Sequence, residues 1–156
     1  MRYWFDTEFD ERERVIHLVS IGIIAEDGRE YYAVNADYDP KMANPWLQEN
    51  VLPFLAGQPR RPRAQIREEV LAFFNPAPTE IWAYFGEYDW VVLRQLVGHM
   101  IEWPAGWPLS HRNLAQWRDQ LGVTELPQQD QDSLHHALED ARWCRAAWQQ
   151  LSQYLA

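Results

Sequence analysis

Cysteine is almost missing from this chain of 156 residues, in which Cys144 is the single example. One cysteine excludes an internal disulfide and any zinc or iron–sulfur site built from several cysteines. Long apolar runs are missing as well, since none approaches the roughly 20 residues that a membrane-spanning helix needs. The first segment, MRYWFDTEFDERER, carries charges where a signal peptide has its apolar stretch. We therefore expect a soluble, cytoplasmic protein with no membrane partner.

Positive charge is also scarce. The chain has 14 lysines and arginines against 23 aspartates and glutamates, which gives a net charge of −9. This balance argues against a protein that coats DNA or RNA with a basic face. An acidic chain can still bind nucleic acid if part of its negative charge holds metal ions, and two divalent ions would reduce the net charge to about −5.

The order of predicted elements favours an α/β fold. β-Branched and aromatic residues predict strands at 2–9, 15–25 and 29–36, and Asp27-Gly28 is a hairpin-turn signal between the last two. These strands would form an antiparallel meander, and a fourth strand is expected at 80–85. Helical periodicity predicts helices at 46–55, 63–74, 88–100, 113–121 and 133–155, the last with Asp132 or Ser133 as its N-cap. The pattern predicts a mixed β-sheet flanked by α-helices, in a single domain spanning residues 1–156.

Two carboxylates stand in the aromatic first strand. Asp6 and Glu8 are two residues apart, so their side chains share one face of a strand, with Cα atoms roughly 6.5–7 Å apart. Carboxylate oxygens so placed suit Mg²⁺ or Mn²⁺. The alternative is that both residues lie on a strand edge that faces solvent.

Two further aspartates stand at helix starts or borders. Asp140 falls at the border of an apolar stripe in the last predicted helix. A charge there is costly unless it is paired with an arginine or bound to a metal. Asp89 follows the fourth predicted strand at the start of a helix, where an acidic residue is also favoured by the helix dipole alone.

Two adjacent histidines, His135 and His136, precede Asp140. A histidine near its ordinary pKa can take a proton from an attacking water. The alternative is a pair of surface histidines in the first turn of a helix. Helix geometry does not choose between them, because His136 and Asp140 are four residues apart and would share a face.

Together these residues resemble the DEDDh 3′–5′ exonucleases, a family with a ribonuclease H-like fold that includes RNase T and oligoribonuclease. That family carries Asp-x-Glu on the first strand, an aspartate after the fourth strand and His-x-x-x-x-Asp at the last helix. This chain has the same motifs in the same order, in the segments WFDTEF (Asp6 and Glu8), GEYDWVVL (Asp89) and HHALEDA (His135 and Asp140). The WFDTEF start, the EDGREYYAV hairpin and the NVLPFL segment are most similar to a small bacterial group of exoribonuclease AS type. The family spacing favours His135, with His136 as the second choice.

The resemblance implies removal of nucleoside 5′-monophosphates from RNA 3′ ends with two divalent cations, Mg²⁺ or Mn²⁺. It implies that Asp6 bridges both ions, that Glu8 and Asp140 complete the first site, and that Asp89 holds the second. It further implies that His135 is the general base, and that the chain forms a homodimer.

Two other residues are candidates for substrate contact. Exonucleases stack the bases of single strands on aromatic rings, and Phe9 is the best placed ring by sequence, although it could equally be core. Arg63, in a basic cluster with Arg60, Arg61 and Arg67, is a candidate contact for backbone phosphates. Two other functions stay open: a DNA-directed exonuclease using the same site, and a non-catalytic module that binds a protein partner.

Overall fold

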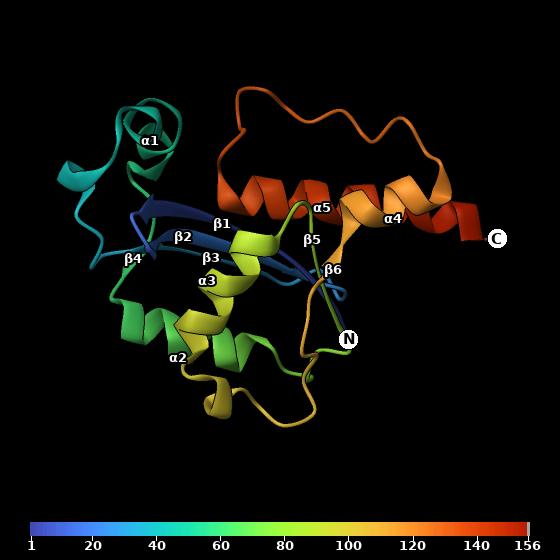
Figure 1. Cartoon of the computed structure of the whole chain (residues 1–156), viewed down its shortest axis with the longest axis horizontal. Helices are drawn as coiled ribbons and strands as arrows, with labels where there is room; N and C mark the ends of the chain where they lie inside the picture. The colour runs from blue at the N-terminus through green and yellow to red at the C-terminus, as the bar shows by residue number, and fades with distance from the viewer. Residues whose placement is uncertain (156) are drawn as a thin grey trace.

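A computed structural model describes residues 1–155, which form a six-stranded mixed sheet with helices on both faces (Figure 1). The sheet order is β4-β3-β2-β1-β5-β6; β1, β2 and β3 are antiparallel, whereas β5 runs parallel to β1. The strands are β1 (Arg2–Arg12), β2 (Val15–Ala25), β3 (Glu30–Asn35), β4 (Arg60–Arg61), β5 (Glu80–Ala83) and β6 (Arg112–Asn113). The predicted α/β class, with its meander and mixed sheet, is confirmed.

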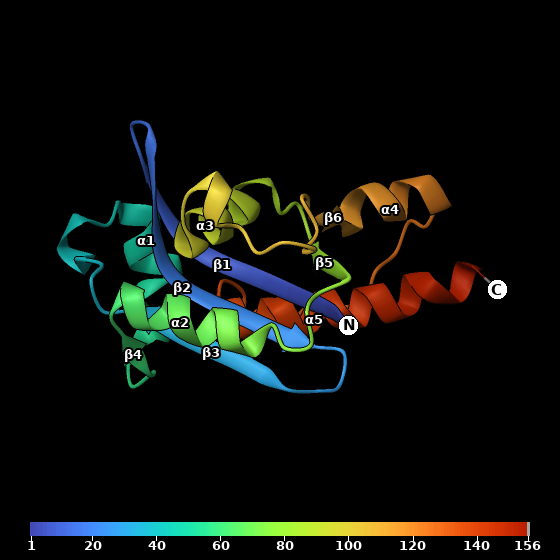
Figure 2. The same ribbon diagram turned by 90° about the horizontal axis from the view of Figure 1, so that it is seen from below.

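Helices cover the sheet in two layers. α4 and α5 lie over one face, while α2 and α3 lie over the other, with α2 in front of the sheet in Figure 2. α1 stands at one end. The helices are α1 (Pro45–Asn50), α2 (Arg63–Phe73), α3 (Glu87–Val97), α4 (Leu114–Leu121) and α5 (Ala137–Ser152). Among residues 1–155, no helix combines the length and apolar character needed to cross a bilayer.

The aromatic first strand contributes to the apolar cores on both faces of the sheet. Tyr3 and Phe5 are fully buried against α2 and α3, whereas Trp4 between them packs with the residues of α4 and α5. This follows from the pleat, which directs successive side chains to opposite faces of a strand. The run of large side chains in β1 is therefore explained by burial on both faces.

β1 is longer than predicted and contains an irregularity at the site. It continues to Arg12, and its pairing with β2 shifts register between Glu8 and Phe9. Phe9 still lies on the side of the sheet that Tyr3 and Phe5 occupy, where it stacks on Tyr88 of α3. This is the side that regular alternation along the strand predicts.

The last helix begins four residues later than predicted, at Ala137. His136 stands at its N-cap, in place of the predicted Asp132 or Ser133. The preceding residue, His135, has a φ of +67°. This left-handed conformation is incompatible with a helix that passes through it. The predicted helix at residues 133–136 was therefore wrong, because the chain turns sharply at the histidines before α5 starts.

Other boundaries also differ from the prediction. β5 ends at Ala83, two residues early, because Phe85 takes a φ of +49° and cannot extend the strand. The predicted helix at 46–55 is divided into α1 and a 3₁₀ turn at Leu52–Leu55. α4 ends as expected at Gly122, whose φ of +67° suits a glycine.

Gly22 of β2 lets the first turn of α5 approach the sheet. A Cβ at this position would lie 2.4 Å from the carbonyl oxygen of Ala137 and 2.5 Å from the Cα of Leu138. Gly22 is also the partner of Asp6 in the β1–β2 ladder. The absence of a side chain here therefore sets how closely α5 sits beside the carboxylates of β1.

We expect Gly22→Ala to lower Tm by about 5 °C, because backbone atoms cannot move aside as a flexible side chain can. Thermal unfolding measured by circular dichroism checks this. Ser20→Ala is the control, since the buried Ser20 hydroxyl has no hydrogen-bond partner among residues 1–155; it should lower Tm by less than about 2 °C. Equal Tm values for Gly22→Ala and the unmodified chain would contradict the close approach.

Candidate active site

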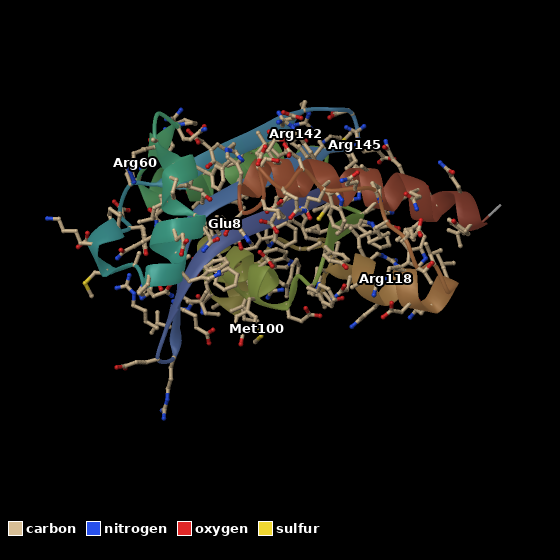
Figure 3. All side chains as sticks on the ribbon, turned by 90° about the horizontal axis from the view of Figure 1, so that it is seen from above. Glu8, Arg60, Met100, Arg118, Arg142 and Arg145 are labelled. Carbon is tan, nitrogen blue, oxygen red and sulfur yellow. The ribbon has the colours of Figure 1, made fainter. Side chains whose placement is uncertain are left out.

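An acidic pocket of about 240 Å³ lies where β1 meets the first turns of α3 and α5. Figure 3 shows Glu8 close to the N-terminal end of α5. The pocket joins segments that are far apart in the sequence, and it includes all five residues that the resemblance to the DEDDh exonucleases predicts for the site. Its lining consists of Asp6, Thr7, Glu8, Phe9, Trp46, Asp89, His135 and Asp140.

Thr7 fixes Asp89 against β1. Its backbone N–H and its hydroxyl donate to Asp89 Oδ1 at 2.9 and 2.6 Å. Asp89 is nearly buried and stands in the first turn of α3. The two bonds leave Oδ2 of Asp89 without a recorded donor among residues 1–155, so one oxygen holds the fold and the other remains available.

Asp140 is held by the segment that precedes α5. The side-chain amide of Gln129 donates to its Oδ1 at 2.5 Å, and the backbone N–H of His135 donates to its Oδ2 at 3.0 Å. These bonds orient the carboxylate and the chain turn together. The salt bridge to an arginine that was the alternative for Asp140 does not occur among the described residues.

Glu8, His135 and Asp140 form the tightest group in the pocket, with one ligand atom from each lying within 4.8 Å of the others. Asp6 and Asp89 line the same pocket but fall outside this group of three. Within residues 1–155, the carboxylates of Asp6 and Glu8 accept no hydrogen bond from any side chain or backbone donor. Their oxygens are therefore free to bind a cation.

The electrostatics of the pocket are those of crowded, poorly solvated carboxylates. Burial raises the pKa of Asp6 and of Glu8 well above the usual range, and the neighbouring carboxylates raise both pKa values further. Burial also raises the pKa of Asp89, against the hydrogen bonds from Thr7. The pKa of Asp140 rises to about 6, again chiefly through burial. Mutual repulsion of this kind is relieved by a divalent cation.

The structure separates the two histidines. His135 lines the acidic pocket, where its ring lies 4.8 Å from that of Trp46 in an edge-on arrangement. His136 instead stacks on Tyr32 of β3, with ring centroids 4.6 Å apart, and its Nδ1 is buried without a partner among residues 1–155. Burial lowers the pKa of His135, which favours the neutral imidazole that can accept a proton.

The two candidate substrate contacts lie in different places. Phe9 lines the pocket and stacks on Tyr88, with centroids 5.6 Å apart and an interplanar angle of 11°. Arg63 lies at the start of α2 and is not part of the pocket lining. Its guanidinium donates to the carbonyl oxygen of Gln95 at 2.5 Å, which ties α2 to α3.

Comparison with known proteins assigns the chain to a family. The model of the 3′–5′ exoribonuclease Rv2179c-like domain matches residues 1–152. The chain belongs to this Rv2179c-like family. It is 45% identical over 148 residues to the 3′–5′ exoribonuclease Rv2179c of Mycobacterium tuberculosis strain ATCC 25618 / H37Rv. The aligned region covers 91% of this chain and 88% of that protein. The 3′–5′ exoribonuclease MT2234.1 of strain CDC 1551 / Oshkosh matches with the same identity and coverage.

Sequence reasoning missed three residues that build the pocket of this Rv2179c-like domain. Trp46 is 51% exposed and covers His135 from α1, but nothing in its local sequence indicates which strand or loop its ring would face. Gln129 lies in a segment whose composition only predicts a linker. Thr7 had a usable signal, since a residue between two site carboxylates points to the opposite face of the strand, towards α3.

The raised pKa values predict how the metal-free domain responds to pH. A carboxyl whose pKa is higher in the folded state stabilises the fold at pH values below about 4, and this stabilisation is lost as the pH rises through about 6 for Asp140. A divalent cation binds the ionised carboxylates, so its stabilising effect should grow over the same interval.

We expect saturating Mn²⁺ to raise Tm by about 5–10 °C near pH 7.5 and by much less near pH 5. Differential scanning calorimetry with and without EDTA measures this. Asp140→Asn should lose most of the Mn²⁺ effect, while Glu139→Gln, which changes the exposed neighbour paired with Arg142, should keep it. A Mn²⁺ effect that does not depend on pH would contradict the assignment.

Proposed function

We propose that this chain is a metal-dependent 3′–5′ exoribonuclease of the DEDDh type, with Asp6, Glu8, Asp89, His135 and Asp140 as its catalytic residues. The observation that carries the proposal is the meeting, in a single pocket, of four carboxylates from β1, α3 and α5 with one imidazole from the segment before α5. The family name and the names of both relatives support the reaction class. The geometry supports the choice of residues.

The donor set fits divalent cations. Carboxylate oxygens are the ligands that Mg²⁺ and Mn²⁺ prefer, and Asp6 and Glu8 keep theirs free of hydrogen bonds within residues 1–155. We assign Asp6 to both ions, Glu8 and Asp140 to the first, and Asp89 to the second through its free oxygen. When bound, two such ions stabilise the attacking and leaving oxygens of a phosphodiester.

His135 is the group that we assign to proton transfer. Its neutral imidazole accepts a proton from the water that attacks the terminal phosphorus. The bond between phosphorus and the 3′ oxygen of the penultimate nucleotide then breaks, and that oxygen takes a proton from solvent. The products are a nucleoside 5′-monophosphate and an RNA shortened by one nucleotide. Trp46 packs against the His135 ring in an edge-on arrangement and so limits its rotation.

The terminal bases of the RNA would stack on aromatic side chains at the acidic pocket. Phe9 lines the pocket, and its stacked partner Tyr88 is 47% exposed at the pocket rim. Stacking on such rings holds single-stranded ends without requiring a particular base. Arg63 lies outside the pocket, so any phosphate that it contacts would be upstream of the reacting bond.

Product analysis tests the proposed function. Single-stranded RNA with a free 3′ hydroxyl should release nucleoside 5′-monophosphates, identified by chromatography, whereas the same RNA blocked at its 3′ end should release none. Matched DNA should be degraded more slowly. Faster cleavage of DNA would instead support the DNA-directed alternative, and binding of metal without cleavage of either strand would support an interaction module.

The homodimer and the cytoplasmic location stay predictions. The chain leaves several large apolar side chains exposed, including Met100, Ile101 and Leu109, and burying such residues between subunits is common in homodimers. Analytical ultracentrifugation measures the oligomeric state directly. The scarcity of cysteine is in keeping with a reducing compartment.

A further inference from the structure

A second and larger cleft, of about 470 Å³, lies on the same molecule away from the acidic pocket. It opens between the β5–β6 edge of the sheet, α4 and the C-terminal end of α5. Figure 3 shows Glu8 at one end of α5 and Arg118 of α4 towards the other end. Its lining includes charged, indole and amide side chains, namely Arg2, Glu80, Trp82, Arg112, Gln116, Trp117, Gln120 and Trp148.

Indole rings form the apolar part of this cleft. Trp82 lies 5.0 Å from Trp117 and 6.4 Å from Trp148, measured between ring centroids. Trp117 is only partly buried, so part of its ring faces the cleft. The guanidinium of Arg112 lies 5.6 Å from the ring centroid of Trp82. Planar ligands bind to such surfaces by stacking.

The lining of the cleft holds two arginines and one carboxylate, and Arg2 is also paired with Glu26 outside the lining at 2.6 Å, so Arg112 is the arginine left to meet an anion. Glu80 is that single carboxylate, and it accepts hydrogen bonds from Trp82 Nε1 at 2.8 Å and from Arg2 Nε at 3.3 Å. Arg112 reaches Glu80 only at 3.8 Å, and its side chain remains 59% exposed. The Arg112 guanidinium therefore keeps donors available for an anion in the cleft, in a protein whose net charge is −9.

Two exposed amides of α4 also line the cleft. Gln116 and Gln120 stand one helical turn apart on α4, so they share a face of the helix. Both line the cleft, both are exposed, and neither side chain makes a hydrogen bond within residues 1–155. A carboxamide offers a donor and an acceptor side by side, which matches the edge of a nucleobase.

From these contacts we infer that the cleft binds one nucleotide unit, with its base stacked against Trp117, its edge against Gln116 or Gln120, and its phosphate at Arg112. The same chemistry occurs in two sources, an internal nucleotide of an RNA strand and a free ribonucleoside 5′-monophosphate. The inference rests on the proposed function, because an RNA-degrading enzyme meets both. Bound RNA would be tethered while its 3′ end is in the acidic pocket.

The cleft is separated from the reacting groups along α5. Asp140 and Trp148 are eight residues apart on this helix, which corresponds to about 12 Å along its axis. A diribonucleotide with its 3′ end in the acidic pocket uses the catalytic residues alone, whereas a long strand has nucleotides left over for the cleft. The two parts of the molecule can therefore be tested separately.

The first experiment measures binding without hydrolysis. Isothermal titration in EDTA compares the unmodified chain with Arg112→Ala and with the double variant Gln116→Ala, Gln120→Ala, using ribonucleoside 5′-monophosphates in one arm and long single-stranded RNA in the other. We expect each variant to weaken binding about tenfold in at least one arm. A loss with the monophosphate supports a free-nucleotide site, and a loss with RNA alone supports a strand site. Unchanged affinity in both arms overturns the inference.

The second experiment measures how cleavage depends on length. Arg112→Ala should lower kcat/KM about tenfold for long RNA if the strand occupies the cleft, and should leave diribonucleotide cleavage unchanged. Arg14→Ala, which removes an exposed arginine from the turn between β1 and β2 and outside the lining of the cleft, is the matched control and should change neither rate. Equal rates for the two variants on long RNA, together with unchanged binding in EDTA, overturn the inference. If the unmodified chain cleaves no RNA, the proposed function fails. The titration in EDTA still shows whether the cleft binds a nucleotide, because it does not depend on cleavage.

Discussion

Replacing Asp6 with asparagine should lower kcat for RNA hydrolysis by at least about a thousandfold. Asp6 contributes oxygens that accept no hydrogen bond within residues 1–155, in a pocket where three other carboxylates surround it. An amide keeps the shape of the side chain but removes its charge, so the cation affinity of the site falls steeply. Asp140→Asn should act in the same way. Single-turnover kinetics with labelled RNA measures both.

The fold should survive these changes. Asparagine removes a buried, poorly solvated charge, so Asp6→Asn should not lower Tm in EDTA and is expected to raise it near neutral pH. Glu11→Gln provides a matched control, because Glu11 is an exposed carboxylate on the same strand and lies outside the pocket. Activity of the Asp6 variant within a factor of about ten of the Glu11 variant would show that the catalytic carboxylates have been assigned wrongly.

Replacing His135 with alanine should lower kcat by about 10²–10⁴, the range typical of a lost general base. Its ring lies in the acidic pocket beside Glu8 and Asp140, and burial lowers its pKa so that the neutral form prevails near pH 7. The loss should appear in kcat with little change in KM, because the imidazole acts on the attacking water and not on the bases.

His136→Ala is the control that the sequence itself offers. The ring of His136 is stacked on Tyr32, outside the acidic pocket. We expect this variant to keep at least about a third of the activity and to lose some stability, since a buried aromatic contact is removed. If the two variants reversed these effects, the base would be His136, the second choice that the sequence left open.

The fold could be predicted well because its signals are local. The β-branched run at residues 15–25 and the Asp27-Gly28 turn predict the meander, and the structure contains it. The boundaries that failed depend on single backbone conformations. Phe85 and His135 both adopt positive φ values, which the propensities of phenylalanine and histidine do not predict. As a result, β5 ends earlier than predicted and α5 begins later.

The acidic pocket was predictable only in part. Its carboxylates occur in short motifs with fixed spacing, so the sequence nominates them together. The contacts that hold them are long-range: Thr7 binds a residue 82 positions away, and Trp46 reaches His135 from α1. Phe9 stacks on Tyr88 of α3, a packing partner that the periodicity of the strand alone does not reveal.

The second cleft had no signal in the sequence. The residues that line it are far apart in the sequence, and none of them belongs to a motif; they include Arg2, Glu80, Arg112 and Trp148. These four residues lie on β1, β5, β6 and α5, which meet at one edge of the sheet only in the folded chain. Aromatic residues usually pack in cores, so the abundance of tryptophan predicted burial and gave no reason to expect an open surface.

We expect the acidic pocket to remove nucleotides from RNA 3′ ends with the help of divalent cations. The most direct test is a time course with 5′-labelled single-stranded RNA and matched DNA, each with Mg²⁺, with Mn²⁺ or with EDTA. We expect a ladder that shortens from the 3′ end in either metal, faster on RNA than on DNA, and no shortening in EDTA or with Asp6→Asn. Full-length RNA that persists under every metal condition would contradict it.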